Sequence, residues 1–436
     1  MAHYLVAASP LAGHVTPMLG IATDLRRRGH SVTFVTGARY HDAIVERGLR
    51  AVALPEEAHP REPVPSALPW RGPSIIESWR SGRADMRSVF ITPLCAQYRT
   101  LQAELERDRP DAVVVDLAFT GALPLLIAER HRPPVVVCGV SPLMLSSVDT
   151  PPFGMGWHPR PGFDYGAMNA FVHHVLFADV QTRLNAELRR LDVGRSPVFL
   201  SDWPKLADRV LQLTVPGAEY RRSDLPSSVI FTGPVVADEL GEAPSLAPWQ
   251  SRLTTSPTVV HVTQGTWDNG DLGQLIAPTL QALADRDDLL VIATTGAPER
   301  SLPAAVIPAN AYVTDWVPYA SLLPHVDVMI TNGGYGGVQH ALSHGIPLIV
   351  AGRTADKPEI AARVEYIGAG IDLKTERPSA AALAAAVRRI LTVEDYRAAA
   401  RRVSHEMAAT APFDTIADVL ARLHVVGDRP PLVPGT

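Results

Sequence analysis

The chain has 436 residues, of which 46% are hydrophobic and 19% are charged, and its formal net charge is −5 at pH 7. This length exceeds what one ordinary core organises, so we expect two domains, and the slightly acidic balance argues against a nucleic-acid partner. The sequence has no apolar run long enough to span a membrane, and Cys95 and Cys138 stand far apart. We therefore expect a cytoplasmic protein without a membrane span.

The first part of the chain alternates apolar strands with helices. A strand over 4–9 is followed by a helix from about 16 to 28 and a strand over 31–36, which is typical of a parallel sheet. Asp116 directly follows another apolar strand, 112–115. We expect Asp116 at the carboxyl edge of the sheet, where open α/β sheets bind their ligands.

Two irregular segments interrupt this pattern. The segment 55–73 is rich in proline, and 141–166 is rich in proline, methionine and aromatic residues. Long loops between regular elements often bind ligands, so we predict a lid and a wall of a hydrophobic pocket, although the second loop could instead cover a sheet edge. The predicted pocket residues are Pro10, Trp70, Trp79, Phe119, Met144, Phe153 and Met155.

A second series of strands and helices follows a segment of mixed composition. Residues 237–257 contain several prolines and glycines without periodicity, which predicts a linker between a domain over 1–236 and a domain over 258–400. We expect an α/β fold in which two Rossmann-like domains face each other across a cleft. We expect the tail, 427–436, to be disordered.

The second domain contains the most informative stretch. A strand over 326–331 runs into the glycine-rich turn 332–337 and then a helix, and such a turn suits a diphosphate because backbone N–H groups point outward. Trp316 precedes this turn and could stack on a base, whereas Asp356 follows the next strand and could bind sugar hydroxyls.

Taken together, this stretch resembles the donor-binding signature of the GT-B nucleotide-sugar glycosyltransferases. In this UDP-glycosyltransferase superfamily the pattern runs W-x-P-Q, H-x-G-x-x-[ST]-x-x-E and D/E-Q. The resemblance, best to bacterial natural-product and macrolide enzymes, implies transfer of a hexose from a nucleotide sugar to a hydrophobic small molecule in antibiotic or other secondary metabolism. It also implies that the final helix, 401–426, packs back on the first domain. The implied donor-binding residues are Gly265, Thr266, Trp316, Val317, Asn332, Gly333, Gly334, Gly336, Gly337, Val338, His340, Asp356 and Lys357.

The sequence departs from the family pattern at five positions. Asn332 replaces histidine, Gly337 replaces serine or threonine, and His340 replaces the glutamate that holds ribose hydroxyls. Tyr319 and Lys357 both stand where the family has glutamine. Without the glutamate there is less reason to prefer a ribose 2′-hydroxyl, so both a UDP-sugar and a TDP-sugar remain open.

His14 is the predicted general base of the reaction. A neutral imidazole can remove the proton of an acceptor hydroxyl near pH 7, and a carboxylate on its second nitrogen fixes its tautomer. The family has an aspartate at the place of Asp116, and we assign Asp116 this role. The alternatives are a helix-start residue for His14, an N-cap for Asp116 and a core aromatic for Trp316.

The implied reaction is inverting and independent of metal, and it needs no cofactor because the nucleotide sugar is a co-substrate. The sequence leaves open whether the protein forms a homodimer. Rival functions are a nucleotide-sugar 2-epimerase of the same fold and a non-catalytic auxiliary homologue. A nicotinamide dehydrogenase is disfavoured because the first strand-to-helix turn lacks GxGxxG.

Overall fold

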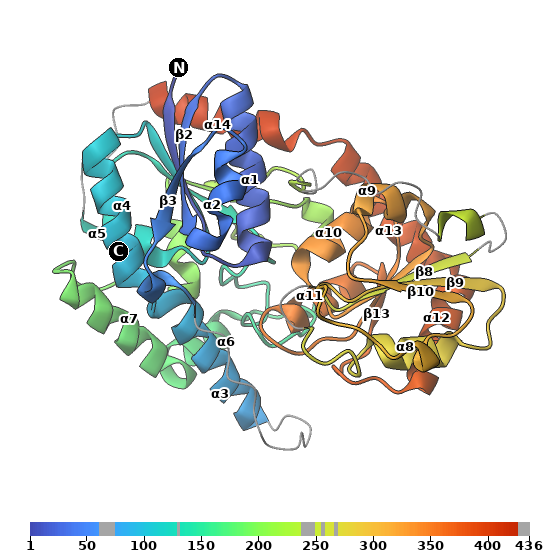
Figure 1. Cartoon of the computed structure of the whole chain (residues 1–436). Coiled ribbons are helices and arrows are strands. Elements are labelled where there is room, and N and C mark those ends of the chain that lie inside the picture. The colour runs from blue at the N-terminus through green and yellow to red at the C-terminus, as the bar shows by residue number, and fades with distance from the viewer. Residues whose placement is uncertain (61–74, 129–130, 237–248, 254–257, 266–268, 426–436) are drawn as a thin grey trace.

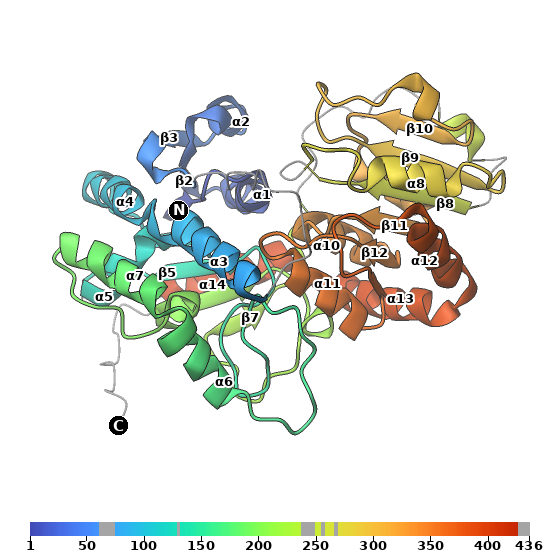
Figure 2. The same cartoon turned by 90° about the horizontal axis from the view of Figure 1, so that it is seen from below.

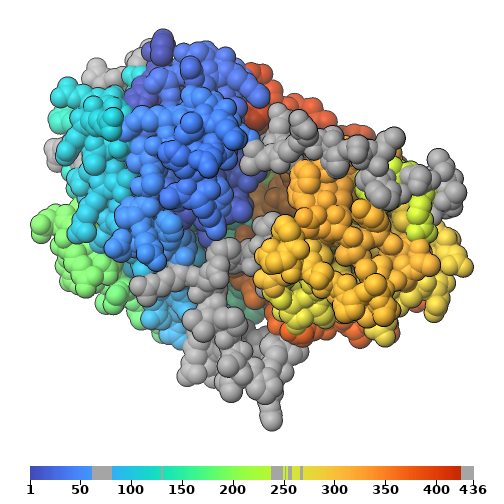
Figure 3. Space-filling view, viewed as in Figure 1, coloured from blue at the N-terminus to red at the C-terminus, as the bar shows by residue number. Residues whose placement is uncertain are grey.

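The computed structural model describes residues 1–60, 75–128, 131–236, 249–253, 258–265 and 269–425. The chain forms two lobes, each built on a parallel sheet with helices on its faces (Figure 1). In the space-filling view, the blue and green lobe meets the yellow and orange lobe along a furrow (Figure 3). This architecture confirms the predicted α/β fold with two Rossmann-like domains.

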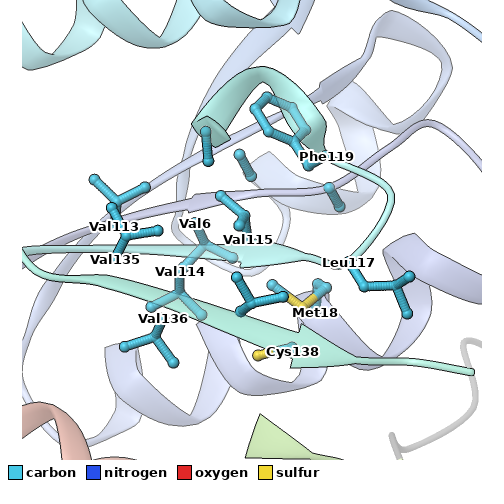
Figure 4. Close-up of a cluster of buried hydrophobic side chains, with 14 of the residues drawn as sticks. Val6, Met18, Val113, Val114, Val115, Leu117, Phe119, Val135, Val136 and Cys138 are labelled. Atoms are coloured by element: carbon cyan, nitrogen blue, oxygen red, sulfur yellow. The ribbon is translucent and has the colours of Figure 1, made fainter. Parts of the chain in front are cut away.

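The amino-terminal domain has a seven-stranded sheet in the order β3-β2-β1-β4-β5-β6-β7. Its strands are β1 His3–Ala7, β2 Ser31–Gly37, β3 Arg50–Leu54, β4 Ala112–Asp116, β5 Val135–Gly139, β6 Arg209–Gln212 and β7 Val229–Phe231. Its helices are α1 Ala12–Arg27, α2 His41–Val45, α3 Ile75–Met86, α4 Leu94–Asp108, α5 Leu123–Ala128, α6 Gly166–Phe171 and α7 Ala178–Arg190. The valine runs of β4 and β5 are buried because central parallel strands are covered on both faces (Figure 4).

The carboxy-terminal domain has a six-stranded sheet in the order β10-β9-β8-β11-β12-β13. Its strands are β8 Thr258–Thr263, β9 Leu289–Thr294, β10 Ala311–Thr314, β11 Val328–Thr331, β12 Leu348–Val350 and β13 Gly370–Asp372. Its helices are α8 Ile276–Leu283, α9 Tyr319–Leu322, α10 Tyr335–Ser343, α11 Lys357–Tyr366, α12 Ala380–Thr392 and α13 Glu394–Ala408.

The last helix, α14 Pro412–Val425, returns to the amino-terminal domain (Figure 1). Ile416 and Leu420 are buried in that domain's core, and Asp414 pairs with Arg28 at 2.6 Å. Helix α13 still packs in the carboxy-terminal domain, so the chain crosses between the two helices, later than the predicted boundary at residue 401.

Most of the predicted linker and the predicted disordered tail lie outside the described residues. Within the linker, Trp249 is buried against the carboxy-terminal domain. Among the residues that the structure describes, no helix is both long and apolar enough to cross a membrane.

The topology determines where each sheet can bind a ligand. The strand order changes direction between β1 and β4 in the first sheet, and between β8 and β11 in the second. In open α/β sheets, the crevice beyond the carboxyl ends of two such strands is the usual binding site. All four strands are followed by predicted site residues.

Candidate active site

His14 lies in the first turn of α1, directly after β1. We predicted it in a loop before a helix starting near residue 16, but the N–H groups of His14 and Val15 both donate to the Leu11 carbonyl at 2.9 Å. The helix therefore begins at Ala12. A Cβ added to the adjacent Gly13 would meet no atom within 4 Å, so open space borders this turn.

Asp116 holds the imidazole of His14 from the end of β4. Its carboxylate is fully buried, and Oδ1 lies 2.6 Å from Nδ1 of His14. The same oxygen accepts the Ala118 N–H at 2.7 Å, and Oδ2 accepts the Ser9 N–H at 2.6 Å. An N-cap would accept from N–H groups inside the next helix, whereas these donors precede it. The carboxylate accepts the Nδ1 proton, so Nε2 is the nitrogen able to take a proton.

Both domains contribute to the electrostatics at His14. Burial alone would lower the pKa of His14, but the carboxylates of Asp116 and Asp356 outweigh it and raise the pKa above its ordinary value. Burial raises the pKa of Asp356, and Lys357 and His14 oppose that rise. Asp356 belongs to the carboxy-terminal domain, so the predicted base and the predicted sugar-binding carboxylate act on each other across the domain boundary.

The predicted donor turn begins directly after β11. Helix α10 starts at Tyr335 instead of residue 338, so the turn itself is Asn332 to Gly334 and the next two glycines lie inside the helix. The first N–H groups of a helix have no acceptor within it. Because a Cβ added at Gly334 or Gly336 would meet nothing within 4 Å, an anion has room to approach these N–H groups.

A second turn, after β8, is joined to the donor turn. Gly265 has a positive φ of 68°, and the Asn332 side-chain amide donates to the carbonyl of Gln264. Asn269 donates to the carbonyls of Gly265 and Thr295 at 3.0 Å each. The two predicted phosphate-binding turns therefore lie side by side, while Thr266 falls outside the described residues.

Lys357 brings a buried positive charge to the donor turn. A Cβ added at Gly333 would lie 3.6 Å from Cβ of Lys357, and one added at Gly352 would lie 2.7 Å from its Cδ. The lysine chain therefore passes beside the turn, and its Nζ donates to Thr354 Oγ1 at 2.6 Å. This cation can supply the charge that Asn332 does not carry.

Trp316 is 42% exposed, which excludes the alternative of a core aromatic, while the adjacent Val317 is buried. His340 faces Tyr319 edge to face, with ring centroids 5.2 Å apart. Burial and the neighbouring His344 lower the pKa of His340 to about 4, so it is neutral near pH 7. A neutral ring therefore stands where the family has a ribose-binding carboxylate.

Three of the predicted acceptor residues are buried within the amino-terminal domain. Phe119 is fully buried and packs in the core above β4 (Figure 4), and Met144 is 8% exposed in the same cluster. Pro10 is buried, and its carbonyl accepts from Arg39 at 2.7 Å. The structure gives these three side chains little or no accessible surface, so the prediction that they contact an acceptor is wrong, because they are buried inside the domain instead.

The remaining acceptor predictions are Phe153, Met155, Trp70 and Trp79. Phe153 and Met155 are half-buried in the segment between β5 and α6. Trp70 lies outside the described residues, and Trp79 lies on α3 with its side chain not described. Phe153 and Met155 are thus the described acceptor predictions with accessible side chains.

We did not predict a buried charge cluster at the domain boundary. Arg363 of α11 bonds Glu359 at 2.8 Å and Glu219 at 2.6 Å, and all three side chains are buried. The spacing of Glu359 and Arg363 on one helix was a local signal for a pair. Glu219 gave none, because it follows β6 in the other domain.

Two facing Rossmann-like domains, each built on a parallel sheet, define the GT-B class of fold. Solved structures support this class: the glycotransferase of kitacinnamycin has a TM-score of 0.75 at 21% identity, with 97% of this chain and 99% of that chain covered. The calicheamicin glycosyltransferase CalG4 has a TM-score of 0.71 at 21% identity, with 99% and 100% covered.

Sequence comparison then gives the family. Residues 277–423 match the family described as erythromycin biosynthesis protein CIII-like, C-terminal domain. The 4′-demethylrebeccamycin synthase of Lentzea aerocolonigenes is 37% identical over 417 residues, covering 94% of this chain and 96% of the relative. UDP-glucosyltransferase B1 of Starmerella bombicola is 32% identical over 434 residues, covering 96% and 98%.

The chain therefore belongs to the nucleotide-sugar glycosyltransferases of natural-product type, which confirms the resemblance inferred from the donor signature. It is a glycosyltransferase. These comparisons give no support to the epimerase alternative.

Proposed function

We propose that the protein transfers a hexose, with inversion, from a UDP- or TDP-sugar to a hydroxyl of a hydrophobic small molecule. One observation carries the proposal. The His14–Asp116 pair lies at the switch point of the first sheet, beyond the carboxyl ends of β1 and β4. The carboxylate of Asp356, from the other domain, raises the pKa of the same imidazole. This interaction supports the proposal that the base and a sugar-binding carboxylate of the other domain belong to one site.

The transfer is a single displacement. Nε2 of His14 takes the proton of the acceptor hydroxyl while the acceptor oxygen bonds to the anomeric carbon. The bond from that carbon to the diphosphate oxygen breaks, and its electron pair leaves with the diphosphate. Asp116 keeps the Nδ1 proton in place and stabilises the imidazolium that forms.

The leaving diphosphate is received by the donor turn. The first N–H groups of α10 have no acceptor within the helix, open space lies beside Gly334 and Gly336, and the helix dipole favours negative charge there. The buried Lys357 adds a full positive charge beside the same turn. We therefore propose that these groups neutralise the leaving group without a metal ion.

Trp316 and His340 form the proposed nucleoside end of the site. The exposed indole of Trp316 can stack on a pyrimidine. The neutral imidazole of His340 occupies the position at which the family has a glutamate that binds the ribose hydroxyls. The names of several relatives support a UDP-sugar, while His340 supports equal tolerance of a TDP-sugar. The other donor-binding residues taken from the signature remain predictions, and two of them, Val317 and Val338, are buried.

The proposal is tested by the products. We expect incubation with α-linked UDP- and TDP-hexoses and a panel of aromatic and macrocyclic alcohols to yield a glycoside, detected by mass spectrometry. NMR of its anomeric proton should show the β configuration. An α-linked glycoside would contradict the single displacement, and conversion of the donor sugar to an epimer without transfer would contradict the proposed reaction.

A further inference from the structure

A carboxylate of the donor domain holds the loop that carries the proposed acceptor residues. Oε1 of Glu359, in the first turn of α11, accepts the N–H groups of Gly154 at 2.9 Å and Gly156 at 2.8 Å. These glycines lie in the irregular segment between β5 and α6, which belongs to the amino-terminal domain and runs beside α11 (Figure 2). One side chain thus connects the two domains at this loop.

The loop backbone also packs directly on the helix. Gly156 has a φ of +61°, and a Cβ added there would lie 2.9 Å from the carbonyl oxygen of Pro358. No other residue type has both this conformation and this clearance at low cost. The contact therefore sets the distance between the loop and α11.

The carboxylate of Glu359 is itself fixed by the buried charge cluster. Its Oε2 accepts from Arg363 at 2.8 Å, and Arg363 donates to Glu219 at 2.6 Å. Glu219 accepts the N–H of Leu143, near the start of the same loop, at 2.8 Å. The cluster therefore anchors the loop at two places, and a buried network of this kind holds one geometry because an unpaired charge would be costly.

Both ends of the proposed reaction meet at this contact. Gly154 and Gly156 flank Met155, a proposed acceptor residue, and Glu359 lies one helical turn from Asp356, the proposed sugar-binding carboxylate. We propose that Glu359 is a positioning residue that sets the register between the acceptor wall and the donor sugar. This inference rests on the proposed function, because it assigns Glu359 a role in the same transfer.

The replacement Glu359→Gln separates this role from general stability. A glutamine has the same size, but its amide carries two donors, so it cannot accept from Arg363 and from both loop N–H groups together. We expect the loop to shift relative to α11 while the nucleotide site keeps its own contacts. Gly156→Ala should disturb the same contact from the loop side while every side chain of the charge cluster stays unchanged.

We expect both variants to change the KM for the acceptor but not the Kd of the nucleotide. In both variants the KM for the acceptor should rise roughly 10- to 100-fold, since a displaced wall makes poorer contact with the acceptor and each tenfold loss corresponds to about 1.4 kcal/mol of binding free energy. Hydrolysis of the donor should take a larger share of turnover, because water replaces a poorly placed acceptor. The Kd of UDP or TDP, from calorimetry, should stay within about twofold of the parent.

Gly162→Ala is the matched control. Gly162 lies in the same loop with a φ of +74°, but a Cβ there would meet nothing within 4 Å. This variant bears similar backbone strain without contact to α11, so its acceptor KM and hydrolysis share should match the parent.

The inference is overturned if Glu359→Gln and Gly156→Ala leave acceptor KM and the hydrolysis share unchanged. It is also overturned if nucleotide affinity falls as far as transfer does, since that would show a general structural role. Failure of the proposed function looks different, because the parent protein itself would then form no glycoside.

Discussion

The replacement Asp116→Asn removes the charge beside the proposed base and keeps the shape of the side chain. In the parent, the two carboxylate oxygens accept from Ser9, Ala118 and His14 at 2.6, 2.7 and 2.6 Å. The asparagine NH2 would face a backbone N–H in either orientation. Leaving a buried donor unpaired costs about 1–3 kcal/mol, so we expect the free energy of unfolding to fall by that amount.

The catalytic cost should be larger. With the NH2 turned toward Ser9, the amide oxygen still accepts the Nδ1 proton of His14, so the tautomer survives but the negative charge that stabilises the imidazolium is lost. We expect kcat/KM for transfer to fall roughly 10²- to 10⁴-fold, within the range that general acid–base groups contribute. This corresponds to about 3–5 kcal/mol of barrier.

The pKa of His14 determines the direction in which the pH profile of the variant should shift. Asp116 and Asp356 raise the pKa of His14 above 6.5, and only the neutral imidazole acts as a base. The parent should therefore lose activity as the pH falls through a pKa above 6.5. Without the Asp116 charge, the pKa of His14 drops, so the acidic limb of Asp116→Asn should move to lower pH around a lower plateau.

The assay is the pH dependence of kcat/KM for glycoside formation, measured between pH 5 and 9, with urea unfolding as the control for folding. A variant with the parent plateau would refute the role of the Asp116 charge. An acidic limb at the parent position would refute the assignment of that limb to His14.

Three further predictions concern nucleotide recognition and stability. Trp316→Ala should raise the Kd of the nucleotide roughly 5- to 150-fold by loss of about 1–3 kcal/mol of stacking, while Trp316→Phe should retain most of the affinity. If calorimetry gave the same Kd for Trp316→Ala as for the parent, the stacking role would be contradicted. His340→Glu should raise the preference for UDP over TDP by roughly tenfold or more, because a carboxylate can accept from the ribose hydroxyls, and His340→Gln is the control; an unchanged ratio of Kd values would show that this position does not meet the ribose. Burial lowers the pKa of His261 from 6.5 to about 4. Below pH 6.5 the unfolded chain therefore binds more protons than the folded protein, and the free energy of unfolding decreases as the pH falls. His261 should account for about 2 kcal/mol of the loss between pH 7 and 5, and urea unfolding of His261→Gln should show a correspondingly smaller loss.

The fold could be predicted because its signals are local. Runs such as the three valines of β4 are continuous apolar stretches, which central parallel strands require. Each domain repeats the alternation of strand and helix, so the parallel topology follows from known handedness and connection rules.

Helix starts were less predictable, for a physical reason. Gly13, Gly336 and Gly337 favour a turn by propensity, yet all three lie inside first helical turns. Tertiary packing of the helices overrides the local preference, because only one face of α10 needs apolar residues and Val338 and Leu342 supply it.

A site residue could be predicted when the sequence around it, together with the order of the strands, indicates its neighbours. His14 and Asp116 could be paired because they follow two strands that the topology places side by side. Phe119 looked similar, but an aromatic ring next to a buried strand packs against the core, and it has no exposed surface. The link between Glu219 and Arg363 joins residues far apart in the sequence, so no periodicity could indicate it.

The most direct test of the account is glycosyl transfer by His14→Ala, measured together with the Kd of the nucleotide. We predict that transfer falls by roughly 10²-fold or more while the nucleotide Kd stays within about twofold, because His14 acts on the acceptor and lies outside the donor turn. Transfer within a few-fold of the parent, at unchanged nucleotide affinity, would contradict the central claim that this imidazole activates the acceptor.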